Sequence, residues 1–308
     1  MNPHAKLGLT APHHAVFAGL ALLALAVLHH PLATLLKSSL ADDAHSSILL
    51  VVPVSALLVW RRRRHVFAHV RYSKASVLAL LALLVALIWV AQPPDSLDQE
   101  SWLSLSTLLC ACWLIAAFAV CYGSHALRRA YFPLMLLLLA GPLPQSLRTR
   151  TILFLQNGSA DAASLLFQLA RVPVNRVGVV LTLPRVTIEI ARECSGLRSS
   201  VVLLITTLLI GHLFLKSWWS QAALVILLVP ITIAKNGLRI FVLSVLGMYV
   251  DPSFLTGRLH HHGGIVFFAL AFACLWGIAE LLQKIERRGR GPRPASAPEP
   301  AMAARNSS

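Results

Sequence analysis

The chain has 308 residues, of which 57% are hydrophobic and 13% charged, and its formal net charge is +15. Soluble domains carry about 25% charged residues, so this composition excludes an ordinary soluble protein and indicates a polytopic membrane protein. The basic residues lie in short clusters beside apolar runs, a pattern typical of membrane topology and not of a nucleic-acid interface.

Eight apolar segments approach the length of about 20 residues that a helix needs to cross a bilayer. The first has no convincing small-residue cleavage site, so we expect a retained span and no cleaved signal peptide. The sixth is short unless its helix begins at Cys194, as we expect. The segments are Val16 to Leu36, Ile48 to Trp60, Ser76 to Ala91, Trp102 to Cys121, Tyr131 to Leu147, Val201 to Leu215, Gln221 to Leu246 and Ile265 to Leu282.

Basic clusters predict the orientation of these segments. They follow the second, fourth, sixth and eighth segments, so all lie on one side if every segment crosses, and the positive-inside rule assigns that side to the cytoplasm. The opposite side receives the acidic loop 93–100 and the long connection 148–193. The clusters are Arg61 to Arg64, Arg128-Arg129, Lys216, and Lys284 with Arg287, Arg288 and Arg290.

The long connection 148–193 shows two local patterns. Apolar residues at helical spacing from Thr151 to Leu169 predict an interfacial helix. The β-branched runs Val177 to Leu183 and Val186 to Ile190 predict a small β-hairpin just before Cys194, either an ordered linker or a substrate-binding element. We therefore expect an all-α membrane protein with about eight transmembrane helices and an outer hairpin. Residues 1–286 form one membrane domain, and 287–308 a disordered basic cytoplasmic tail.

Cys194 is the cysteine predicted to lie near water, because the other four, Cys110, Cys112, Cys121 and Cys274, fall in apolar segments. If its helix starts at or just before Cys194, the helix dipole stabilises the thiolate and Arg198 shares its face. Both effects lower the pKa of the thiol from about 8.5, as a nucleophile requires. An inert, interfacial Cys194 is an equal alternative.

Two further polar groups are predicted at the same membrane depth. Arg239 lies roughly 27 Å along segment seven from Gln221, and Asn236 shares its face; a functional role competes here with snorkelling to the headgroups. Before segment eight, His260 to His262 are followed by Gly263 and Gly264. A catalytic acid or base, or a polar helix start, is favoured over a metal site, because adjacent histidines do not face one another and no partner ligand is placed nearby.

The motifs Cys194-Ser195-Gly196-Leu197-Arg198, Asn236-x-x-Arg239 and His260-x-x-x-Gly264, in this order, resemble those of the exosortase/archaeosortase family of membrane cysteine transpeptidases. A nucleophile, a cation and a proton-transfer group are the parts that acyl transfer needs. The resemblance begins near the long outer loop; the first five segments match only in number and hydrophobicity. Glu193 departs from it, standing where a small residue usually precedes the cysteine.

The resemblance implies that Cys194 attacks a peptide bond near the C-terminal sorting signal of an exported protein and forms a thioester. Arg239 would stabilise the oxyanion or substrate, and His260, or else His261, would transfer protons. It further implies PEP-CTERM-like substrates, a bacterial membrane and an exopolysaccharide context. From the residues themselves we place the site at the outer face of the cytoplasmic membrane and expect no cofactor, metal or nucleic acid.

Two other functions compete with this interpretation. Arg239 and the histidines suit the polar pathway of a transporter, although no internal repeat is evident and the polar groups gather at one surface. The chain also suits a non-catalytic component of an exopolysaccharide export system.

Overall fold

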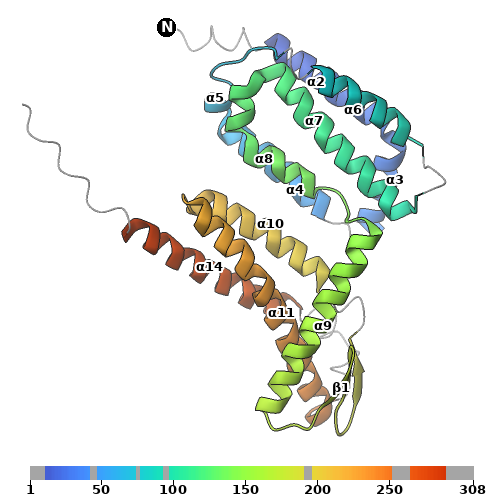
Figure 1. The fold of residues 1–308 in the computed structure, drawn as a ribbon, viewed down its shortest axis with the longest axis vertical. Helices are drawn as coiled ribbons and strands as arrows, with labels where there is room; N and C mark the ends of the chain where they lie inside the picture. The colour runs from blue at the N-terminus through green and yellow to red at the C-terminus, as the bar shows by residue number, and fades with distance from the viewer. Residues whose placement is uncertain are drawn as a thin grey trace, which may run out of the picture.

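The computed structural model describes residues 11–41, 47–73, 77–92, 97–190, 196–251 and 264–288. Its helices form two groups, with α2 to α8 in one and α9 to α14 and a small sheet in the other (Figure 1). The elements are α2 Ala11–Val27, α3 His29–Ala41, α4 Ser47–Arg61, α5 Arg63–Val66, α6 Val77–Val90, α7 Gln99–Arg129, α8 Tyr131–Leu136, the 3-10 turn η3 Leu137–Leu139, α9 Gln145–Leu169, β1 Asn175–Val177, β2 Val180–Thr182, β3 Thr187–Glu189, α10 Leu197–Phe214, α11 Trp218–Tyr249 and α14 Gly264–Arg288.

The first group is organised around the long helix α7, against which α2, α3 and α6 pack. Two tryptophans of α7 bond to two of these neighbours, α6 and α2, by donating their indole N–H groups to backbone carbonyls. Trp102 bonds to Val90 and Trp113 to Leu20, each at 2.9 Å. Both rings are buried, so each satisfies its single polar atom while it contributes apolar area to the core.

The eight predicted spans are not all confirmed. Among the described residues, α7, α10, α11 and α14 are long and apolar enough to cross a membrane, and α2 with α3, bent by 75°, would make a fifth span. Helices α4 and α6 are apolar but shorter. The chain is therefore a membrane protein with several spans, and the part of it described supports four or five by this measure.

The predicted fifth span, Tyr131 to Leu147, is wrong. The segment contains the short α8 and the turn η3, and then a stretch without helix at residues 140–144 before α9 begins at Gln145. Pro142 and Pro144 cause the break, because proline has no backbone N–H and pushes the preceding residue out of the helical conformation.

Helix α9 packs along α11 in the second group (Figure 1). The predicted helix from Thr151 to Leu169 is confirmed and begins six residues earlier, at Gln145. The two helices cross closely because small residues meet: a Cβ on Gly237 would lie 2.5 Å from the Cβ of Ala162. This crossing has no room for a larger side chain.

The strands form an antiparallel sheet in the order β1-β2-β3. The predicted hairpin is confirmed as β2 and β3, with Leu181 opposite Ile188. β1 was not anticipated. It joins β2 through a two-residue turn in which Gly178 has φ +63°, a conformation that glycine adopts readily.

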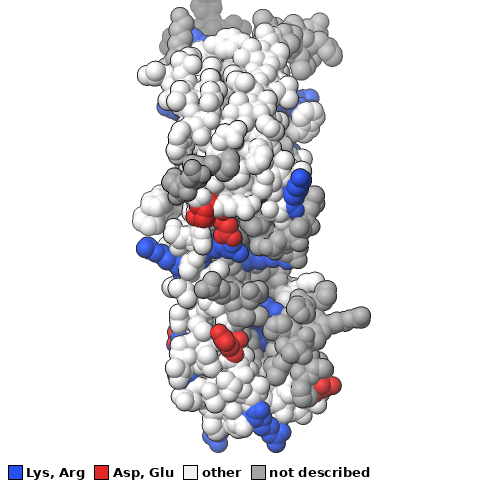
Figure 2. All heavy atoms as spheres, turned by 90° about the vertical axis from the view of Figure 1, so that its right-hand side faces the viewer, with Lys and Arg blue, Asp and Glu red and all other residues white. Residues whose placement is uncertain are grey.

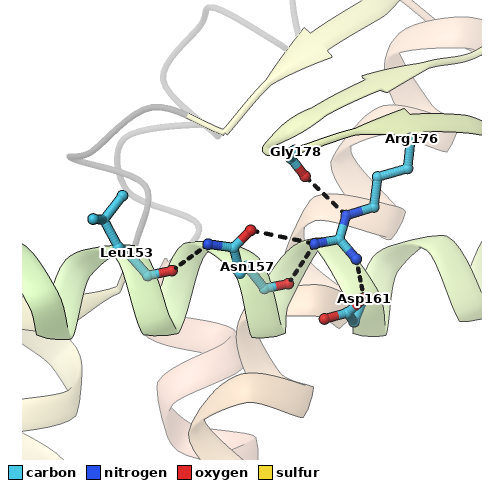
Figure 3. A network of polar contacts seen from close by, with 5 residues as sticks. All are labelled: Leu153, Asn157, Asp161, Arg176 and Gly178. Carbon is cyan, nitrogen blue, oxygen red and sulfur yellow. Dashed lines mark hydrogen bonds and ion pairs between the residues drawn. The ribbon is translucent and has the colours of Figure 1, made fainter.

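The sheet rests on α9 and on the C-terminal part of α11 through buried apolar residues that include Leu181, Leu183 and Ile190. Arg176 of β1 fastens it further: its guanidinium pairs with Asp161 and bonds to Asn157 on α9, and it donates to the carbonyl of Gly178 at 2.8 Å (Figure 3). The sheet is thus held to the helices by both packing and polar contacts.

The basic ends of several helices lie at one end of the bundle. The ring of Phe132, just after α7, stacks on His212 in the last turn of α10, with ring centroids 3.8 Å apart. The backbone N–H groups of Lys216 and Ser217 donate to Glu286 near the end of α14. The basic residues in the last turns of α7 and α14, and Lys216 after α10, therefore lie at one end of the bundle, as the sequence predicts. On another face, few charged side chains appear in the upper part, and they gather near the middle and lower end (Figure 2).

Candidate functional site

Gly196 caps the N-terminus of α10 in a left-handed conformation, with φ +74° and ψ +12°. A Cβ at this position would lie 3.3 Å from Oδ1 of Asn236 on α11, so the backbone of Gly196 lies directly against that amide. The helix begins at Leu197, so the predicted start at Cys194 is wrong, and the face-sharing of Cys194 and Arg198 loses its basis. Gly196 instead provides a tight turn into the helix.

Gly264, the first residue of α14, lies beside Arg239 of α11. A Cβ on Gly264 would be 4.0 Å from Nη1 of Arg239, whose side chain is half-buried. The structure thus brings Asn236 to Gly196 and Arg239 to Gly264. Three motifs that are distant in the sequence meet where the ends of α10 and α14 flank α11.

Asn236 also contacts α9. Its Nδ2 donates to Oγ of Ser159 at 2.9 Å, and both residues are almost completely buried, with exposed fractions of 1% and 0%. Because an unpaired buried amide is costly, this bond and the tight contact with Gly196 fix the rotamer of Asn236. One side chain therefore links α9, α10 and α11.

Lys235 is a site residue outside the three predicted motifs. Its Nζ donates to Oγ of Ser199 at 2.5 Å, and Ser199 in turn donates to the carbonyl of Gly196 at 2.9 Å. Lys235 is only 7% exposed and, among the described residues, forms no ion pair. The available signal was an ionisable residue inside an apolar span, which marks a functional candidate by default.

The chain that leads toward the cysteine is fixed at Ile190. The buried side chain of Gln156 on α9 donates its Nε2 to the carbonyl of Ile190 at 2.6 Å. Ile190 N–H donates to the carbonyl of Val179 at 3.0 Å and completes the ladder beside β3. Residues on both sides of the segment 191–195 are thus held in place, by Gln156 at Ile190 and by Asn236 at Gly196.

Several predicted site residues lie outside the described residues: Cys194 and Ser195 in 191–195, and His260 with His261 in 252–263. Arg198 is described and is exposed in the first turn of α10. The described part of the site therefore comprises the backbone turn at Gly196, the amide of Asn236, the basic side chains of Lys235 and Arg239, and the start of α14.

A comparison with known protein families identifies the family of the chain. The model of the transmembrane exosortase family (Exosortase_EpsH) matches residues 37–277. The chain belongs to this family. No curated protein and no solved structure matches it.

The exosortase match extends further than the motifs alone indicated. It begins at residue 37, within α3, and so includes N-terminal helices for which only number and hydrophobicity had suggested similarity. It ends at residue 277 in α14 and covers every residue of the candidate site. Family membership supports a sorting-related function of this membrane protein.

Proposed function

We propose that this exosortase is a cysteine peptidase or transpeptidase that cleaves the C-terminal sorting signal of exported proteins. The observation that carries the proposal is the pair of contacts on α11, Asn236 with Gly196 and Arg239 with Gly264. Cys194 precedes Gly196 by two residues, so the chain allows its Cα at most about 7 Å from that of Gly196. His260 precedes Gly264 by four residues.

Cys194 is the proposed nucleophile. Its thiolate sulfur attacks the carbonyl carbon of the scissile peptide bond, a C–S bond forms, and an electron pair moves onto the carbonyl oxygen. Arg239 then stabilises the negative oxygen, as a fixed cation in a partly water-excluded site does effectively. Lys235, four residues earlier on the same helix, adds positive charge.

His260 is the proposed proton carrier, with His261 as the alternative. It accepts the thiol proton of Cys194 and donates it to the departing amine when the C–N bond breaks. The remaining thioester is resolved by an acceptor amine, which makes the protein a transpeptidase, or by water, which makes it a peptidase.

The proposed substrates carry a short motif followed by a transmembrane helix and a basic end, as in PEP-CTERM-like tails. The proposed location is the outer face of a bacterial cytoplasmic membrane, in an exopolysaccharide context. Two features support this side of the membrane. The basic clusters at the C-terminal ends of α7, α10 and α14 share one end of the bundle, and the site lies at the N-terminal ends of α10 and α14.

Covalent trapping tests the proposal. Wild-type protein and Cys194→Ala are each expressed with exported proteins that bear candidate sorting tails, and tail cleavage and hydroxylamine-sensitive adducts are followed. We expect cleavage and an adduct with the wild type and neither with Cys194→Ala at equal membrane abundance. Full cleavage by Cys194→Ala would exclude Cys194 as the nucleophile, and transport by reconstituted vesicles that resists thiol alkylation would favour a transporter.

A further inference from the structure

The outer edge of β3 carries backbone hydrogen-bonding groups in a defined pattern. In the antiparallel ladder of β2 and β3, Leu183 N–H donates to Val186 at 2.9 Å and Ile190 N–H to Val179 at 3.0 Å. Leu181 and Ile188 lie opposite each other, two residues from each of these bonded pairs. Because bonded and non-bonded pairs alternate, Ile188 turns its backbone groups toward β2, and Thr187 and Glu189 turn theirs away from it.

Within the described part of the chain, these outward groups have no backbone partner. β3 is an edge strand, and among the described residues no backbone group bonds to the outer side of Thr187 or Glu189. The side chains of both residues are exposed. Two N–H groups and two carbonyls thus stand in the spacing that an extended chain requires.

The opposite edge is less suitable. The β1–β2 ladder directs the backbone groups of Asn175 and Val177 toward β2, which leaves only Arg176 facing outward. The side chain of Arg176 is engaged with Asp161 and Asn157 on α9 (Figure 3). β3 also leads within a few residues to Gly196 and the rest of the site.

We infer that the edge of β3 binds an extended segment of the exported substrate as a fourth strand, through Thr187 and Glu189. This inference rests on the proposed function and adds how the substrate is held. Main-chain pairing supplies affinity with little dependence on sequence, and the Glu189 carboxylate favours a basic or hydroxyl side chain opposite it. The anchor from Gln156 to Ile190 keeps the edge fixed, which lowers the entropy lost on binding.

Photocrosslinking of the full chain tests this pairing. The probe is a biotinylated synthetic peptide of alternating threonine and valine with one benzophenone side chain. Thr187→Pro removes the outward N–H at an edge position that tolerates proline, and Thr187→Ala keeps the N–H as the matched control. We expect Thr187→Ala to label like the wild type and Thr187→Pro to label about threefold to tenfold less, the effect of one hydrogen bond.

A second probe keeps the test conclusive if the proline variant misfolds, because it is applied to the wild type. The same peptide with every amide N-methylated keeps its side chains and loses its donors, so its labelling of the wild type should be weak. Equal labelling by both peptides, or by all three proteins, would overturn the inference. A fall in dimer content of Thr187→Pro with labelling unchanged would overturn it in favour of edge-to-edge pairing of two copies. Labelling needs neither Cys194 nor a cut, so a protein that labels and cleaves no tail would contradict the proposed function alone.

Discussion

The guanidinium of Arg239 lies 4.0 Å from the position that a Cβ would take on Gly264, which is ordinary van der Waals contact. One methyl group therefore fits between α11 and the start of α14, and a longer side chain directed toward α11 would meet the guanidinium of Arg239. This spacing makes Gly264 a sensitive position for testing the role of Arg239.

Gly264→Leu should lower tail cleavage by about tenfold or more, because the leucine displaces the Arg239 guanidinium from its place in the site. Gly264→Ala is the matched control and should cleave like the wild type. The measurement is the initial rate of tail cleavage at equal membrane abundance. Equal rates for the two variants would show that Arg239 does not act from its observed position.

Gly196→Ala should destabilise the protein by about 1–2 kcal/mol from the left-handed backbone alone, and by more because its methyl meets Asn236 at 3.3 Å. Gly178→Ala is the matched control, since Gly178 also has positive φ but nothing within 4 Å of an added Cβ. Thermal unfolding and tail cleavage are measured for both. The backbone cost should appear in both variants, and the loss of cleavage only in Gly196→Ala.

Lys235→Met should lower cleavage by about tenfold, because it removes positive charge from beside the proposed oxyanion site, and it should not lower the thermal midpoint. Methionine fills a similar volume and removes the cost of burying an ammonium group with one observed neutral partner. Ser199→Ala provides the contrast, because it removes that partner and should destabilise the fold by about 1–3 kcal/mol. A Lys235→Met protein that unfolds early but cleaves normally would assign Lys235 a structural role only.

The start of α7 should weaken in acid. The backbone N–H of Ser101 donates to Asp98 at 2.9 Å and lowers the pKa of Asp98 below its ordinary value of 3.8. The resulting stabilisation is complete above that value and is lost as the pH falls through the lowered pKa. The thermal midpoints of the wild type and Asp98→Ala should therefore converge in acid. Asp98→Asn keeps the cap without a charge and should hold a constant difference from Asp98→Ala.

Hydropathy predicted most of the helices, but individual residues such as proline determine where they begin and end. The apolar run from Leu134 to Leu139 masked the break that Pro142 and Pro144 impose, although the prolines were visible in the sequence. β1 was missed because it is three residues long and begins with two polar residues, Asn175 and Arg176. Its formation depends on pairing with β2 and on contacts with α9, which a local pattern does not contain.

Within the candidate site, the sequence indicated the depth of Asn236, Arg239 and Gly264 but not their partners. The start of α10 was misplaced because Gly196 caps it in a left-handed conformation, which is more usual after the end of a helix. Lys235 was visible as a charge within a span. Its position in the site is defined by its hydrogen bond to Ser199, which belongs to another helix, so only the packed structure relates the two residues.

The contacts of Asn236 and Arg239 also determine when the site can form during synthesis. Ser159, Gly196, Asn236 and Gly264 follow one another along the chain, and each contact joins a residue to one made later. Because the N-terminal part of a chain leaves the ribosome first, α9 and α10 form their contacts with Asn236 only after α11 has been made. Arg239 forms its contact with Gly264 only when α14 inserts. A nascent or prematurely terminated chain that lacks α14 therefore carries an incomplete site, in which the contact between Arg239 and Gly264 has not formed.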